Sequence, residues 1–369
     1  MQNSFYGSCH TLMFIVACLI ATQFPIVNVA FAGPVKHGAG RMSTSYPQQV
    51  PAIIITDLAR YSDDAVALMM LLRSGGLDVK GIITTAGNVC AGDAAFETRR
   101  LLEALGHENA LVVPGPSMAC HEVRRRYYRE TEISSGQPPG YVGAFGEHVR
   151  CETEAQRNQE GASDSSGDRA VEFLIAAAKT SERRLIVVLQ GPATILALAL
   201  TKEPRLPELL SHVYVMGGAL RVHGNTTSFS EFNVWFDPEA MSALLKSGAE
   251  ITLVPLDATR AVTYAPFRPE QLLQQDPATQ YLSEYLEFRQ AGGRREIAMW
   301  DEVLAAIVID PSTVKRRSDQ PIAVSVARDK EYGRLIELPQ TAQKKPVRIV
   351  LEVDGKKVNK LISELLLGK

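Results

Sequence analysis

From Pro51 onward, short runs of apolar, often β-branched residues alternate with segments whose apolar residues recur at helical spacing. The runs at 52–56, 79–85, 110–114, 185–189, 213–216 and 251–255 predict strands, and the segments at 64–73, 94–105, 169–179, 193–201 and 238–247 predict helices. Because consecutive parallel strands need a crossover, usually a helix, this alternation predicts an α/β fold: an open, mainly parallel, Rossmann-like sheet flanked by helices. No internal repeat or dividing linker interrupts residues 50–369, so we expect a single domain there.

Two stretches interrupt the alternation. Residues 117–168 are polar and rich in Gly, Ser, Arg and Glu, and loops of this length are usually functional lids or insertions. Residues 266–295 are charged and helical in pattern, with Tyr281, Tyr285 and Phe288 at helical spacing. We expect these three aromatic side chains to face the core.

The amino-terminal residues differ in composition from the rest. Residues 12–32 carry almost no charge and end in Ala30-Phe31-Ala32, a sequence similar to signal-peptidase sites. We therefore predict a signal peptide over 1–32, a Pro/Gly/Ser-rich linker over 33–49, and export to the periplasm or medium. Since Lys36 is the first basic residue, an uncleaved anchor stays open, as does a lipoprotein signal at residues 15–18.

Charge and cysteine content limit the partners. The formal net charge is −2, so no basic face for nucleic acid is expected. We expect a small-molecule substrate, a homo-oligomer and no stable membrane partner once the signal is removed. Cys120 and Cys151 bracket the polar stretch 117–168, and either a disulfide between them or two free thiols is compatible with export.

Three acids follow the first predicted strand. Asp57 comes directly after the run 52–56, and Asp63 and Asp64 precede the next helix. The two later acids would suit a helix start on their own, but Asp57 would lie at the strand's tip beside them. In open α/β sheets, ligands bind at the carboxyl ends of the strands. Crowded carboxylates repel one another, so the sequence predicts a hard cation among them, Ca²⁺ or Mg²⁺.

Other polar groups follow later strands or precede helices. Asp301 precedes an apolar helix, where it could be either a helix cap or a further acid of the site. Asn225, Glu231 and Asn233 lie after the strand at 213–216. Amide and carboxylate groups suit a polyhydroxylated ligand, because each sugar hydroxyl both donates and accepts hydrogen bonds.

Taken together, these motifs resemble the inosine–uridine-preferring nucleoside hydrolase family. Matching segments occur in the family's order over roughly residues 50–366: the acidic strand end with Asp57, Asp63, Asp64 and Ala65; residues 81–88 (GIITTAGN); residues 191–194 (GPAT); residues 215–218 (VMGG); Asn225; residues 231–233 (EFN) ahead of residues 237–240 (DPEA); residues 253–259; and Trp300-Asp301. One such motif would be weak, whereas this many in order is a specific signal.

The resemblance implies hydrolysis of the N-glycosidic bond of ribonucleosides and assigns residues to it. The calcium ligands would be Asp57, Asp64, Asp301 and the carbonyl oxygen of Thr194. The ribose contacts would be Asp63, Asn88, Asn225, Glu231, Asn233 and Asp301, with Met216 lining the pocket. Asp57 would be the general base that takes a proton from water.

Trp300 is the residue that we expect to contact the leaving base. It occupies the position where some family members have a histidine. This resembles the purine-preferring branch, in which an indole stacks on the base, and it favours purine nucleosides. A tryptophan packed in the core, and an acid supplied by His121 or His148, are the alternatives.

Several positions depart from the family pattern, among them Ile55, Arg60, Tyr61 and Ile195. These departures leave substrate specificity open. Two other functions therefore stay open: a calcium-dependent hydrolase of another ribosyl or glycosyl compound, and a non-catalytic exported protein that binds nucleosides or sugars.

Overall fold

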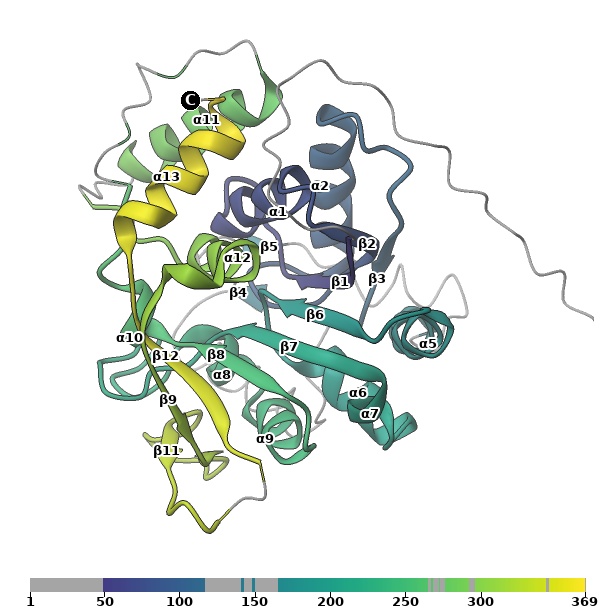
Figure 1. The fold of residues 1–369 in the computed structure, drawn as a ribbon, viewed down its shortest axis with the longest axis vertical. Helices are drawn as coiled ribbons and strands as arrows, with labels where there is room; N and C mark the ends of the chain where they lie inside the picture. The colour runs from purple at the N-terminus through teal and green to yellow at the C-terminus, as the bar shows by residue number, and fades with distance from the viewer. Residues whose placement is uncertain are drawn as a thin grey trace, which may run out of the picture. The chain divides into compact units, whose positions relative to one another are not determined.

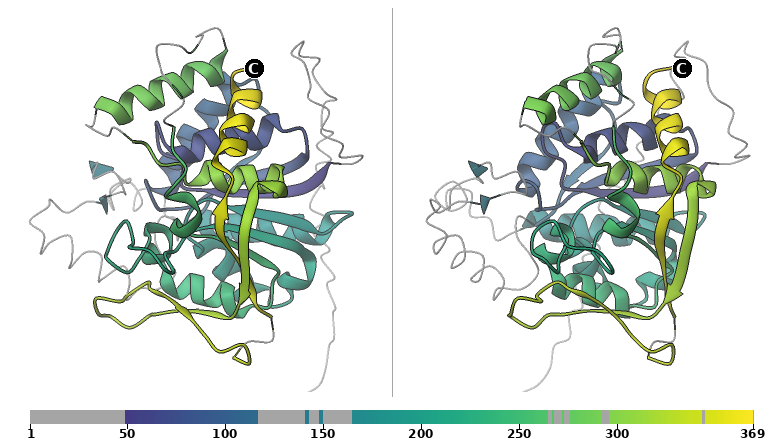
Figure 2. Two further views of the ribbon diagram at one scale, coloured as in Figure 1. Left: turned by 60° about the vertical axis from the view of Figure 1, so that its left-hand side comes forward. Right: turned by 90° about the vertical axis from the view of Figure 1, so that its left-hand side faces the viewer.

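An open twisted sheet carries the fold (Figure 1), and in the part of the chain that the structure describes it has eight strands in the order β3-β2-β1-β6-β7-β8-β12-β9. The computed structural model describes residues 49–116, 141–142, 148–149, 165–264, 267, 272, 276–291, 296–342 and 345–368. The strands of this sheet are β1 (Val50–Thr56), β2 (Leu77–Thr84), β3 (Val112–Pro114), β6 (Leu185–Leu189), β7 (Leu210–Met216), β8 (Ile251–Val254), β9 (Val314–Gln320) and β12 (Val347–Val353). Neighbouring strands are parallel except β12 and β9, which lie antiparallel at one edge (Figure 2).

Helices cover both faces of the sheet (Figure 1). On one side of the sheet, a single hydrophobic core joins α1 (Asp63–Arg73), α2 (Ala91–Ala104), α11 (Pro277–Ala291), α12 (Asp301–Ile309) and α13 (Gly355–Leu366), with α11 and α13 in contact with α1. The other packs against α5 (Ser165–Thr180), α6 (Thr194–Lys202), α7 (Leu206–Leu209) and α9 (Pro238–Lys246). The short helices α8 (Phe232–Phe236), α10 (Leu256–Thr259) and η2 (Pro311–Thr313) lie in connections.

Strand β1 shows why this sheet is a three-layer structure. Its side chains alternate between two separate cores: Ala52 and Ile54 belong to the core under α1, while Ile53 and Ile55 belong to the core over α6. All four side chains are fully buried. A strand that is apolar on both faces can only be buried in the middle of a helix-covered parallel sheet, as the uninterrupted isoleucine run indicates.

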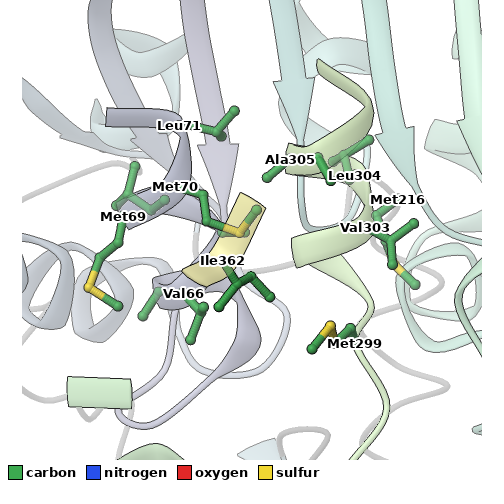
Figure 3. Packing of buried hydrophobic residues seen from close by; sticks show 14 of the residues in the cluster. Val66, Met69, Met70, Leu71, Met216, Met299, Val303, Leu304, Ala305 and Ile362 are labelled. Atoms are coloured by element: carbon green, nitrogen blue, oxygen red, sulfur yellow. The ribbon is translucent and has the colours of Figure 1, made fainter. Parts of the chain in front are cut away.

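The packing of α1 against α12 positions the polar residues described below. Val66 and Met70 of α1 and Leu304 of α12 belong to one cluster of buried side chains, which Ile362 of α13 joins (Figure 3). Both helices start at the carboxyl ends of the sheet strands, with acidic residues in their first turns. Apolar packing between two helices therefore brings two sets of carboxylates to one place.

The predicted α/β fold and every predicted strand and helix named above are confirmed, with shifted ends. Helix α5 begins at Ser165, so the polar stretch is shorter than predicted, and it contains the antiparallel pair β4 (Tyr141–Val142) and β5 (His148–Val149). The rest of residues 117–164 lies outside the described residues. The strands β10 (Ile322–Val324) and β11 (Leu335–Glu337) form a second antiparallel pair that the sequence pattern did not predict.

The prediction of a core-facing aromatic trio was partly wrong. Tyr285 is fully buried, but Phe288 is 42% exposed. The helix α11 turns Phe288 towards the loop after β1, where its ring centroid lies 5.5 Å from that of Tyr61. Helical spacing placed these residues near one side of α11, but that side extends beyond the core.

The predicted signal peptide and linker lie outside the described residues and stay predictions. Within the described residues, every helix is too short or too polar to span a membrane. Cys90 is disulfide-bonded, a pairing that the sequence did not suggest. Its partner, like Cys120 and Cys151, lies outside the described residues.

Candidate active site

The central strands of the sheet end in polar residues at one edge. Asp57 directly follows β1, which lies between β2 and β6. Asn88 follows β2 and Gln190 follows β6. Parallel strands end at a common edge, so these three side chains come from adjacent points of the fold.

A group of buried carboxylates lies at this edge. One carboxylate oxygen from each of Asp63, Asp64 and Asp301 lies within 4.8 Å of the others. The sequence-predicted metal set names Asp57 where this group has Asp63, but Asp57 is also buried and interacts electrostatically with Asp64. Oδ1 of Asp57 and Oδ1 of Asp301 have no hydrogen-bond partner among the described residues. Buried oxygens without partners are suited to a cation.

Neither Asp64 nor Asp301 is an N-cap residue, although both, like Asp63, lie in the first turn of a helix, where a negative charge is favourable. Ser62 is the N-cap residue of α1, and it makes no side-chain cap bond. Asp64 instead accepts from the Thr56 hydroxyl at 2.7 Å and from Nδ2 of Asn88 at 3.0 Å. Asp301 is likewise the first residue of α12, after the N-cap residue Trp300. Asp64 is therefore oriented by the ends of β1 and β2 while it lies in the first turn of α1.

Burial dominates the electrostatics of the cluster. It raises the pKa of Asp57 well above its usual range, and the neighbouring Asp64 carboxylate raises it further. Burial followed by the charge of Asp63 raises the pKa of Asp64 to about 7. Burial also raises the pKa of Asp301, and the carboxylates of Asp64, Asp63 and Asp57 contribute. Carboxyl groups in this state gain most from a cation that replaces their protons.

Two glycines allow the backbone to approach Asp57. A Cβ atom at Gly191 would lie 2.7 Å from Oδ1 of Asp57, and a Cβ atom at Gly87 would overlap the same carboxylate. The backbone amide of Asn88 donates to Oδ2 of Asp57 at 2.5 Å. Asp57 is therefore enclosed by the loops that follow β2 and β6.

Thr194 begins α6, three residues beyond Gly191 on the loop that encloses Asp57. Its hydroxyl donates to Oδ2 of Asp237 at 2.7 Å, which fixes the start of α6 against the start of α9. The sequence prediction concerned the carbonyl oxygen of Thr194, which is a separate atom from this bonded hydroxyl.

A pocket opens above the carboxylates and contains all the predicted substrate contacts. Its lining comprises Asp63, Asn88, Met216, Asn225, Glu231, Asn233, Trp300 and Asp301, together with Gln190, Thr226 and Phe232. The last three were missed by sequence reasoning. Gln190 directly follows a predicted strand and could have been found by the strand-end rule, whereas Thr226 and Phe232 carry no such signal.

Several of these polar side chains also build the pocket wall. The Glu231 carboxylate accepts from the backbone amides of Gly218, Asn233 and Val234 at 2.8, 2.8 and 3.2 Å. Its burial raises its pKa, and these amide hydrogen bonds oppose the rise. Oδ1 of Asn225 accepts from the Phe232 amide at 2.9 Å. The loop that presents these groups is thus held by their own side chains.

Trp300 lies beside a buried cation that the sequence did not reveal. The guanidinium carbon of Arg289 lies 5.7 Å from the centroid of the Trp300 ring. Arg289 is only 4% exposed, and its charge opposes the burial that raises the pKa of Asp63. Arg289 lies on the same buried side of α11 as Leu282 and Tyr285. A charged residue at helical spacing from apolar residues is unusual, and this pattern could have identified Arg289 from the sequence.

The loop between β1 and α1 is fastened to α11 through Tyr61. Tyr61 has a φ of 57°, a conformation that costs a non-glycine residue about 1–2 kcal/mol. Its hydroxyl donates to Glu284 at 3.1 Å, and its ring lies 5.9 Å from that of Tyr281. These contacts offset the strain and hold the loop that carries Asp57 and Asp63.

Known proteins are similar to this chain in sequence and in fold. A sequence profile of the inosine-uridine preferring nucleoside hydrolases matches residues 52–360. The pyrimidine-specific ribonucleoside hydrolase RihA of Escherichia coli is 31% identical over 206 residues, which is 56% of this chain and 60% of that protein. An uncharacterised protein of Schizosaccharomyces pombe is 29% identical over 207 residues, or 56% of this chain and 61% of that protein. The chain thus matches only about 60% of the length of these curated relatives.

Solved structures share the fold at low sequence identity. A plant nucleoside hydrolase superposes with a TM-score of 0.70 at 23% identity, covering 87% of this chain and 100% of that one. A purine-preferring ribonucleoside hydrolase from Gardnerella vaginalis gives 0.67 at 23% identity, covering 86% and 98%. Together with the profile match over most of the chain, the shared fold and the acidic strand ends identify this protein as a member of the inosine-uridine preferring nucleoside hydrolase family.

Proposed function

We propose that this protein hydrolyses the N-glycosidic bond of ribonucleosides, releasing ribose and the free base. The observation that carries the proposal is the convergence of buried carboxylates from the first turns of α1 and α12 at a pocket lined by amides and carboxylates. Polar groups of this kind suit a sugar, and the family membership supports the reaction class.

We further propose calcium as the resident cation, held by Asp57, Asp64, Asp301 and the carbonyl oxygen of Thr194. The support is the donor set: buried carboxylate oxygens, two of which have no hydrogen-bond partner among the described residues. Oxygen donors of this kind fit Ca²⁺, and also Mg²⁺, better than softer metals. A cation bound there would lower the pKa of a water molecule and so supply a nucleophile near neutral pH.

The protein's own groups would do the rest of the chemistry. Oδ1 of Asp57, the free oxygen of that carboxylate, would accept a proton from the attacking water. The water oxygen bonds to C1′, while the C1′–nitrogen bond breaks and its electron pair leaves with the base. Asp63, Asn88 and Asn233 would hold the ribose hydroxyls, and so orient C1′ towards the water. The surrounding carboxylates would stabilise positive charge that develops on the sugar.

The preference for the base is a separate proposal, and we favour purine nucleosides. Trp300 lines the pocket, and a partly exposed indole offers a stacking surface for the larger base. RihA is described as a pyrimidine-specific ribonucleoside hydrolase, so the similarity to RihA favours pyrimidine nucleosides instead. Comparing kcat/KM for inosine, adenosine, guanosine, uridine and cytidine decides between them.

The test of the proposed function is ribose release from those five nucleosides, measured after chelation and again after calcium is restored. We expect release that chelation abolishes and calcium recovers. Asp57→Asn should remove it, while Asp319→Asn, on the exposed edge strand β9, should leave it unchanged. Binding of a nucleoside measured by calorimetry, with no ribose released, would instead support a non-catalytic protein that binds nucleosides or sugars. Inactivity towards all five, with release of ribose from another ribosyl compound, would support the alternative hydrolase.

We also propose that the protein is exported and forms a homo-oligomer. The uncharged residues 12–32 and the cleavage-site pattern at Ala32 support export. Amino-terminal sequencing of protein recovered from a secreting host tests the cleavage, and light scattering after size-exclusion chromatography tests the oligomer. Mature protein that still begins at Met1 would contradict the proposed signal cleavage. A monomeric mass would contradict the proposed homo-oligomer.

A further inference from the structure

Gln190 is one of the residues that line the pocket, and nothing in the family resemblance assigns it a role. Its backbone amide donates to Ile55 at 2.8 Å, and its carbonyl accepts from Nδ2 of Asn233 at 3.1 Å. The next residue, Gly191, is the one that lies against Asp57. The backbone of Gln190 is therefore fixed between the carboxylate cluster and the proposed ribose contacts.

The side-chain amide of Gln190 is only half engaged. Nε2 donates to the backbone carbonyl of Asp64 at 3.4 Å, a long hydrogen bond. Oε1 is buried and has no hydrogen-bond partner among the residues that the structure describes. The residue as a whole is 1% exposed, yet it is one of the residues that line the pocket. A buried acceptor without a partner is unfavourable unless a ligand or an ordered water supplies the donor.

We infer that Gln190 is a substrate-binding residue whose Oε1 accepts a hydrogen bond from one hydroxyl of the ribose. This inference deepens the proposed function and rests on it. With Nε2 directed to the Asp64 carbonyl, Oε1 is the end of the amide that is available to a ligand. A hydroxyl is the sugar group that can donate to a neutral carbonyl oxygen.

The position of Gln190 favours the sugar over the base. Its contacts are with Asp64 and Asn233, groups proposed to surround the ribose and the cation. Trp300, the proposed stacking surface for the base, is the N-cap residue of α12 and makes no hydrogen bond to Gln190 among the described residues. The chemistry at Gln190 should therefore follow the hydroxyls of the sugar and not the identity of the base.

The test compares the effect of one substitution on the full substrate with its effect on substrates that each lack one hydroxyl, as in a double-mutant cycle. Steady-state kcat/KM is measured for wild type and Gln190→Met on inosine and on its 2′-, 3′- and 5′-deoxy analogues, with the uridine series as a second set. Methionine keeps the length and approximate volume but removes the acceptor. We expect about a tenfold loss on inosine, the size expected for one hydrogen bond. On the one analogue that lacks the contacted hydroxyl, variant and wild type should differ less than about twofold.

Controls separate this inference from a structural role. Gln320→Met is the matched substitution on the outermost strand β9. Gln320 pairs with Val347 at the amino end of β12, whereas the site lies at the carboxyl ends of the central strands. It should behave as wild type throughout. Gln190→Asn, which retracts the amide, should repeat the selective loss if the methionine variant folds poorly. The calcium concentration for half-maximal activity should be unchanged in the Gln190 variants.

Other results would contradict either the role of Gln190 or the proposed function. An equal loss on inosine and all three analogues, or a loss that follows the base instead of the sugar, would overturn the role of Gln190 while leaving the hydrolase intact. A large shift in the calcium requirement together with an equal loss would make Gln190 a support of the metal site instead. A wild-type protein that releases no ribose from any nucleoside would refute the proposed function itself.

Discussion

Removing one buried carboxylate should make the metal-free protein more stable at neutral and alkaline pH. Asp64 is fully buried, and its pKa rises from the ordinary 3.8 to about 7, chiefly because of burial. A raised pKa means that folding favours the protonated form, so this contribution to stability is present at acid pH and is lost as the pH rises through about 7. Each pH unit between the two pKa values is worth about 1.4 kcal/mol. Chelated wild type should thus lose about 3 kcal/mol between about pH 5 and pH 8 through this group alone.

Asp64→Asn removes the charge while keeping the shape, and its amide can still pair with Thr56 and Asn88. In chelator, the variant should lose about 3 kcal/mol less than wild type over the same pH range, measured by urea unfolding followed by circular dichroism. Calcium should restore the stability of wild type at about pH 8 but have little effect on the variant. Asp319→Asn, an exposed acid on β9, is the matched control. Chelated wild type that is equally stable at both pH values would refute the reasoning, as would a variant that loses as much as wild type.

Three further predictions concern activity. Asp57→Asn should lower kcat by about 10²–10⁴ with saturating nucleoside and calcium, because the general base is lost; wild-type turnover would contradict the assignment. Gly191→Ala should weaken calcium binding measured by calorimetry and lower kcat/KM, since its Cβ atom would lie 2.7 Å from Oδ1 of Asp57; unchanged affinity would show that the loop can move aside. Trp300→Ala should reduce kcat/KM for purine nucleosides by an amount equivalent to about 1–3 kcal/mol and for pyrimidine nucleosides by less, and an equal loss would remove the argument for purine preference.

The apolar patterns and strand ends were readable from the sequence because they depend on local periodicity. The isoleucine run before Asp57 is apolar at every position, which indicates a strand buried on both faces. Asp57, Asn88 and the acids of the next helix follow their strands within a few residues. Strand ends in a parallel sheet share one edge, so their proximity followed from the order of elements. The family resemblance added residues such as Thr194 and Trp300, whose proximity to the acids no local pattern indicates.

Only the tertiary structure decided which distant groups meet and which interpretation of each acid holds. Asp301 could have been a helix cap on sequence grounds, but the packing of α12 on α1 brings its carboxylate to Asp63 and Asp64. The burial of Arg289 beside Trp300 and the free oxygen of Gln190 depend on the same three-dimensional packing. Periodicity indicates which face of an element is buried, whereas the partner of a buried polar atom is set by contacts between different segments of the chain, such as those that carry Asp64 and Asp301. Those contacts depend on the shapes of whole packed layers, and no short stretch of sequence contains that information.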